Sequence, residues 1–177
     1  MARKVRAFTF IVGRGFSADR IKGPLDILGS LGSPVLIDID SVYSPLHLSS
    51  GLMHAARAIY NDEARAREPS IEVLRWLSGS HQVSQGIDIS GPSQVTGRLL
   101  AVILPDDWPA REDTVSLPEI REETWEGEQI EGLGPVDPPF RYGEGEALKK
   151  LGIDIKDGSI DEEERAVLEN LCLTDLK

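Results

Sequence analysis

LLAVIL, residues Leu99–Leu104, is an apolar run with no polar interruption. Such a run is typical of a central strand that is covered on both faces of its sheet. Two further apolar, β-rich runs precede it, FTFIV within Val5–Val12 and PVLIDI at Pro34–Ile39. We therefore expect strands at all three places, with 99–104 in the interior of the sheet.

Helical patterns surround these strands. Ser44-Pro45 is a favourable helix start, because serine can cap free amides and proline is tolerated at the first helical position. We expect that helix to continue to Ala66, and its Gly51 to permit close approach of another element. Apolar spacing and breakers predict the other helices within 17–32, 69–79, 81–91, 145–151 and 161–172.

Length and composition indicate one globular domain, residues 1–177. Hydrophobic residues make up 40% and charged residues 28% of the chain. The apolar runs are too short to span a bilayer, and the N-terminal stretch reads as a first strand rather than a signal peptide. Cys172 is the only cysteine, which rules out an internal disulfide and a cysteine-based zinc site. A cytoplasmic location is the default expectation.

The net charge of −11 is unevenly distributed. Residues 1–104 hold 11 lysines and arginines against 9 acidic residues, whereas residues 105–177 hold 8 against 21. An acidic total argues against a general nucleic-acid-binding protein, whose affinity depends on neutralising phosphates. The nearly neutral first part still permits a local basic or neutral patch.

An acidic segment follows the central strand. Residues 105–139 contain six of the eleven prolines, eleven acidic residues and two arginines. This composition predicts an extended and partly mobile excursion, with a short hairpin within 114–130. We also expect it to be dispensable for stability, because it has few large apolar residues.

The sequence offers no supported catalytic or metal constellation, and we expect no cofactor. Gly13-Arg14-Gly15 lacks the remainder of a phosphate-binding motif, so a plain turn is the expected reading. His47 and His54 are seven residues apart, whereas a metal pair on one helix prefers three or four. Hydrogen-bonded histidines at a packed or partner surface are the simpler interpretation.

Between Leu48 and Gly91, several short pieces of sequence occur in a characteristic order. They are His54-Ala55, Arg57-Ala58, Ile71-Glu72-Val73-Leu74, the Ser78-Gly79 break, Gln82-Val83 and Ile87. Over 44 residues these pieces resemble the KEOPS-complex small subunit that binds the complex's atypical kinase, the p53-related-protein-kinase-binding protein family with its archaeal and fungal relatives. The C-terminal VLENLCLTDLK resembles the apolar ending of that family. His81 stands where the family often has arginine.

The resemblance implies an α+β fold, a single domain with a mixed, mostly antiparallel sheet packed by helices. It also implies a non-enzymatic subunit with two partners. One is the small kinase/ATPase of the complex, which the subunit binds and supports. The other is the 3′ end of tRNA, held while threonylcarbamoyladenosine is made. No membrane partner is implied.

The resemblance also suggests two sets of binding residues. The kinase-binding set lies on helices, the last helix included, and comprises Leu52, Ala56, Val167, Leu168 and Leu171. The tRNA-binding set surrounds the turn at 78–82 and comprises Arg57, Arg75, Gly79, His81 and Gln82. If the last helix serves for docking, a chain truncated after Gly158 should keep a folded core.

Two other functions remain open from the residues alone. The first is an acidic protein-interaction domain that makes no contact with RNA, which the net charge favours. The second is a small-molecule enzyme that uses the Gly13–Gly15 turn, which would need a pocket with convergent polar groups.

Overall fold

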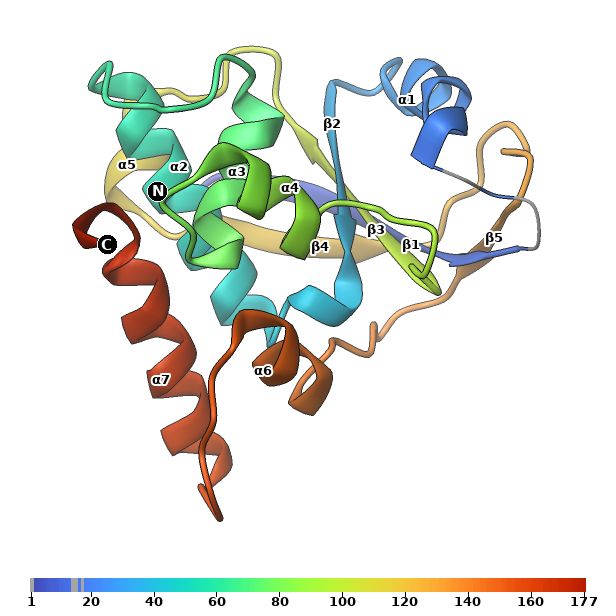
Figure 1. Ribbon diagram of the computed structural model, residues 1–177. Coiled ribbons are helices and arrows are strands. Elements are labelled where there is room, and N and C mark those ends of the chain that lie inside the picture. Colours follow the sequence, from blue (N-terminus) through green and yellow to red (C-terminus); the bar gives the residue numbers. More distant parts are fainter. Residues whose placement is uncertain (1, 14–15, 17) are drawn as a thin grey trace.

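The fold is α+β, as predicted, with helices packed on a mixed, mostly antiparallel sheet (Figure 1). The computed structural model describes residues 2–13, 16 and 18–177. The helices are α1 (Lys22–Leu28), α2 (Pro45–Tyr60), α3 (Pro69–Ser78), α4 (Val83–Ser90), α5 (Arg111–Val115), α6 (Gly145–Leu151) and α7 (Ile160–Cys172). The strands are β1 (Lys4–Val12), β2 (Ser33–Asp38), β3 (Arg98–Leu104), β4 (Glu119–Glu123) and β5 (Leu133–Val136). None of the described helices is both long enough and apolar enough to cross a membrane.

The LLAVIL run forms β3, in the interior of the sheet as predicted. It pairs antiparallel with β2 on one side and with β1 on the other, in the order β2-β3-β1-β4. Leu100 and Val102 face the larger core beneath the helices, and Leu99 and Ala101 face a second core on the opposite side. Both faces are covered, which explains why the run contains no polar residue.

Two layers cover the sheet. Helices α2 and α3 supply the larger core with Leu48, Leu52, Val73 and Leu77, all buried. Figure 1 shows α2, α3 and α4 gathered on one side of the sheet, with α7 running along the edge of this helical layer. The opposite face is covered by α1 and by the chain around Trp125.

The acidic segment 105–139 is not an excursion from the fold, and the predicted hairpin within 114–130 is wrong. Its strand β4 pairs parallel with Lys4–Phe8, and β5 pairs antiparallel with Thr9–Val12, so both extend the same edge of β1. Trp125, Ile130 and Leu133 are buried in the second core. A few apolar residues are enough to anchor the segment because the backbone ladder to β1 provides the remaining contacts.

Helix α2 begins where the sequence predicts and ends earlier. The Ser44 hydroxyl accepts a hydrogen bond from the His47 amide at 3.2 Å, which confirms the cap. The helix stops at Tyr60 rather than Ala66, and Asp62 takes a positive φ of 59°. The predicted close approach at Gly51 is confirmed, since a Cβ there would lie 2.5 Å from Leu77 Cδ2.

Candidate functional site

The turn between α3 and α4 is held tightly against the C-terminal part of the chain. Gly79 ends α3 in the left-handed conformation, with φ of 69°, which favours glycine. A Cβ at this position would collide with the side chain of Asn170 on α7. Glycine therefore serves both the backbone geometry and the docking of α7.

A cleft of about 400 Å³, here called the turn cleft, opens beside this turn. Its lining consists of Ser78, Gly79, Ser80, His81, Gln82, Gln85, Ile89, Leu151, Asn170 and Lys177. Three residues of the predicted tRNA-binding set, Gly79, His81 and Gln82, thus share one concave surface.

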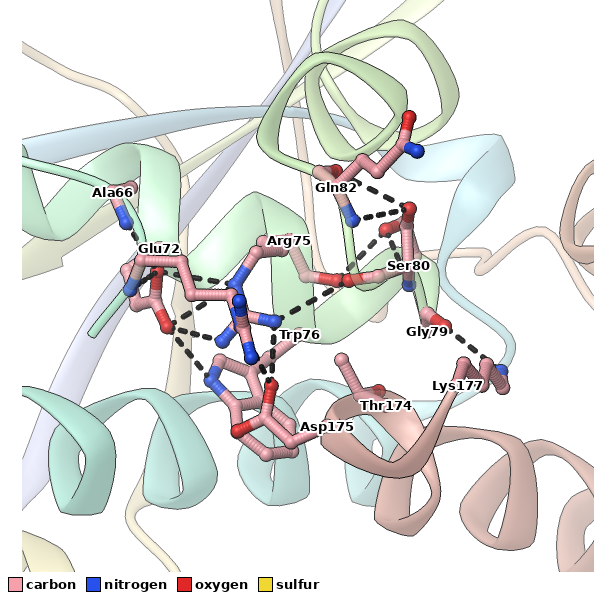
Figure 2. A network of polar contacts seen from close by, with 12 residues as sticks. Ala66, Glu72, Arg75, Trp76, Gly79, Ser80, Gln82, Thr174, Asp175 and Lys177 are labelled. Carbon is pink, nitrogen blue, oxygen red and sulfur yellow. Dashed lines mark hydrogen bonds and ion pairs between the residues drawn. The ribbon is translucent and has the colours of Figure 1, made fainter. Parts of the chain in front are cut away.

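Lys177 is the cation of the turn cleft, and the sequence reading missed it. Its ammonium donates to the Gly79 carbonyl at 2.8 Å and to Asn170 Oδ1 at 2.5 Å. Figure 2 shows the side chain beside the turn. Partial burial lowers the pKa of the Lys177 ammonium. Lys177 and Gly79 are 98 positions apart in the sequence, so no local pattern could have revealed this contact.

The lining of the turn cleft is suited to a negatively charged ligand. It includes Lys177 and no acidic side chain, although the whole chain has a net charge of −11. Gln82 is the N-cap of α4, and its exposed side chain makes no capping hydrogen bond. The half-buried His81 adds an imidazole whose Nδ1 has no partner among the described residues. A helix N-terminus presents amides and a positive dipole end to phosphate.

The prediction that Arg75 contacts phosphate is wrong. Its side chain is fully buried and forms ion pairs with Glu72 at 2.5 Å and Asp175 at 2.8 Å. Trp76 Nε1 donates to the same Glu72 carboxylate at 3.1 Å, and Figure 2 shows these groups converging. The spacing of three between Glu72 and Arg75 was a sequence signal for an internal pair on one helix face.

The network around Arg75 fastens the C-terminus to α3. Burial by itself lowers the pKa of Arg75, but the hydrogen bonds to Glu72 and Asp175 outweigh it and raise the pKa above its ordinary value. The guanidinium therefore stays charged, and its charge is balanced by the carboxylates of Glu72 and Asp175 instead of being free for a ligand. Asp175 and Lys177 anchor the last residues on either side of the turn.

Arg57, the other arginine of the predicted tRNA-binding set, also lies away from the turn at 78–82. Its guanidinium donates twice to the Thr114 carbonyl of α5, at 3.2 and 3.1 Å. It does not belong to the lining of the turn cleft. Arg57 therefore joins α2 to α5 instead of extending the site.

Four of the five predicted kinase-binding residues are core residues. Leu52, Ala56, Val167 and Leu171 have at most 1% of their surface exposed. Leu171 lies near Gly51 and packs in the same core as Leu52, while Val167 packs with α6 and Tyr43. Val167 and Leu171 of α7 are therefore covered by their own chain, and truncation after Gly158 should unfold the protein rather than leave a folded core that cannot dock.

The outer face of α7 remains accessible. Leu168 is partly exposed and lies in a shallow, open depression with Cys172 and charged side chains of the same helix. Just beyond, Leu173 and Leu176 are 48% and 79% exposed. We call Leu168, Cys172, Leu173 and Leu176 the outer α7 face.

The remaining sequence candidates do not add to the site. His47 is fully buried; its Nδ1 accepts from the Tyr43 amide at 3.0 Å, and its Nε2 lies 3.0 Å from the Leu77 carbonyl. Burial lowers the pKa of His47 to about 4, with a smaller opposing effect of the Leu77 carbonyl. The predicted turn at Gly13–Gly15 lies largely outside the described residues, because Arg14 and Gly15 are among those not described.

A comparison with models of known protein families finds no match for this chain, and a comparison with curated proteins finds none either. The candidate site therefore rests on the residues and their geometry.

Proposed function

We propose that this chain is a non-catalytic subunit of a cytoplasmic KEOPS-like complex, which binds the small kinase of the complex and helps recruit the 3′ end of tRNA for threonylcarbamoyladenosine modification. The observation that carries the proposal is the turn cleft. Gly79, His81 and Gln82, which the sequence resemblance suggested, meet Lys177 on a surface without acidic side chains. A single-stranded end needs few contacts, so a local patch suffices in an acidic protein.

The described residues contain one thiol–imidazole contact, between Cys172 and His54. Cys172 is exposed, and its Sγ lies 3.9 Å from His54 Nε2. His54 stacks on Trp76 with ring centroids 5.0 Å apart. Within the described residues no group hydrogen-bonds the other imidazole nitrogen, whereas a catalytic base is usually oriented by such a group.

The tRNA part of the proposal is tested at Lys177. Lys177→Glu removes a favourable charge and adds a repelling one, so we expect roughly tenfold weaker tRNA binding and a shallower salt dependence. Lys22→Glu is the matched control, because it makes the same change on α1, over the opposite face of the sheet. Fluorescence titration of labelled tRNA measures both.

Trimming the terminal nucleotides of the tRNA should remove most of the difference between wild type and Lys177→Glu. If neither protein binds intact or trimmed tRNA measurably, the chain is an acidic protein-interaction domain without RNA contact. Measurable and equal binding in all four combinations would exclude the turn cleft as the site for the 3′ end. Either result would leave the kinase part of the proposal standing.

The kinase part is tested on the outer α7 face. Leu173→Asp together with Leu176→Asp places charge on two exposed apolar side chains, and we expect more than tenfold weaker binding of the small kinase. Val115→Asp is the control, because Val115 is also exposed, at 71%, but lies on α5. Calorimetry with the purified kinase reports the affinities, and equal affinities for all three proteins would exclude this face as the docking surface.

A further inference from the structure

A second concave surface lies apart from the turn cleft and shares no lining residue with it. It has a volume of about 770 Å³ and is formed by the start of α2, the end of β4, the chain at 139–145 and the first turns of α7. We call it the acidic cleft. It plays no part in the tRNA or kinase proposals.

The acidic cleft is lined by the carboxylates of Glu122, Glu144, Glu163 and Glu164 and by one basic residue, Arg141. Three of these carboxylates are positioned by neutral donors. The Phe140 amide donates to Glu122 at 2.7 Å, the Tyr43 hydroxyl to Glu163 at 2.8 Å and the Ser44 hydroxyl to Glu164 at 2.5 Å.

Neutral donors orient a carboxylate without cancelling its charge. Within the described part of the chain, none of the four glutamates forms an ion pair. Burial raises the pKa of Tyr43, and the hydrogen bond and negative charge of Glu163 raise it further. The four glutamates outnumber the one basic residue of the lining, so the cleft carries a net negative field, which favours a positively charged ligand.

The hydroxyl of Tyr142 is a second observation, independent of the glutamates, that points to a ligand in the acidic cleft. Its side chain forms part of the wall, is only 7% exposed, and has a buried hydroxyl without a hydrogen-bond partner among the described residues. A buried polar group without a partner is uncommon and unfavourable. A ligand with several N–H donors could satisfy this hydroxyl and the glutamates together.

The chemistry of the wall selects an organic cation over a metal ion. Among the described residues, no group of three or more histidine, cysteine or acidic side chains is arranged to hold a metal. The rings of Tyr43, Phe140 and Tyr142 line the same cleft and offer surfaces for hydrocarbon and for cation–π contact. We propose that the acidic cleft binds an ammonium or guanidinium group, with its N–H donors on the glutamates and its hydrocarbon part against the aromatic rings.

Such a group can come from a free polyamine or from a lysine or arginine of a basic protein segment. Calorimetric titration of the full chain with spermidine and, separately, with a capped tri-arginine peptide distinguishes the two sources. Saturable binding of either probe is the expected result. Absence of binding by both probes at physiological ionic strength would overturn the proposal.

The double variant Glu163→Gln with Glu164→Gln keeps acceptors for Tyr43 and Ser44 but removes two charges. We expect the bound probe to lose roughly tenfold in affinity. Asp161→Asn with Glu169→Gln is the matched control, since it removes two charges from the same helix outside the cleft. An equal loss in the control pair would show a general field effect and contradict a specific site.

Tyr142→Phe tests the unpartnered hydroxyl. We expect several-fold weaker binding of the probe, because one hydrogen bond to the ligand is lost. The thermal stability of the free protein should not fall, because the hydroxyl has no partner to lose. Unchanged affinity would contradict the part assigned to this group.

Discussion

Replacing Arg75 by methionine should lower the free energy of unfolding by about 3–5 kcal/mol, the cost of removing one partner of a buried ion pair. Methionine fills much of the volume, so the loss is mainly electrostatic. Glu72 would remain fully buried without its cation, and Asp175 would lose a bond that holds the C-terminus. Urea unfolding at several protein concentrations measures the effect.

Arg65→Met is the matched control for Arg75→Met. Arg65 also faces Asp175, at 3.6 Å, but its side chain is 46% exposed, so a change below about 1 kcal/mol is expected. Adding Glu72→Gln to Arg75→Met should recover part of the loss, because it removes the uncompensated charge. Equal effects of the two arginine substitutions would mean that the buried network contributes no more than a surface pair.

Trp125→Ala should cost about 3–5 kcal/mol, the range for truncating a buried aromatic side chain. Trp125 belongs to the acidic segment that the composition marks as dispensable, yet it packs edge-on against Phe8 with centroids 5.3 Å apart. Its Nε1 donates to the Glu128 carbonyl at 2.8 Å, which closes the loop over the ring. Chemical denaturation gives the free energies.

Glu126→Ala is the natural comparison for Trp125→Ala. It changes the adjacent, exposed residue of the same acidic segment and should alter stability by no more than about 0.5 kcal/mol. If Trp125→Ala proved equally mild, the segment would be peripheral after all, and its strands would contribute little beyond their backbone pairing.

Local signals explain what could be predicted along the chain. An uninterrupted apolar run marks β3 as an interior strand, Ser44-Pro45 marks the start of α2, and Gly79 marks the end of α3. These features depend on residues within a few positions of one another, so a single sequence contains them. The strands β4 and β5 were missed because they depend on pairing with β1, which is more than 100 residues earlier in the chain.

For this protein, the sequence by itself determined the strands β1, β2 and β3, the start of α2 and the glycine turn at 78–82. Only the tertiary structure decided which charged side chains are free to contact a ligand and which are paired inside the protein. Periodicity identifies residues that share a helix face but not what covers that face, so Leu171 and Arg75 became interior groups. Arg75 is neutralised partly by Asp175, 100 residues away, and Lys177 reaches the turn cleft from the far end of the chain, because docking of α7 brings together groups that no local pattern connects.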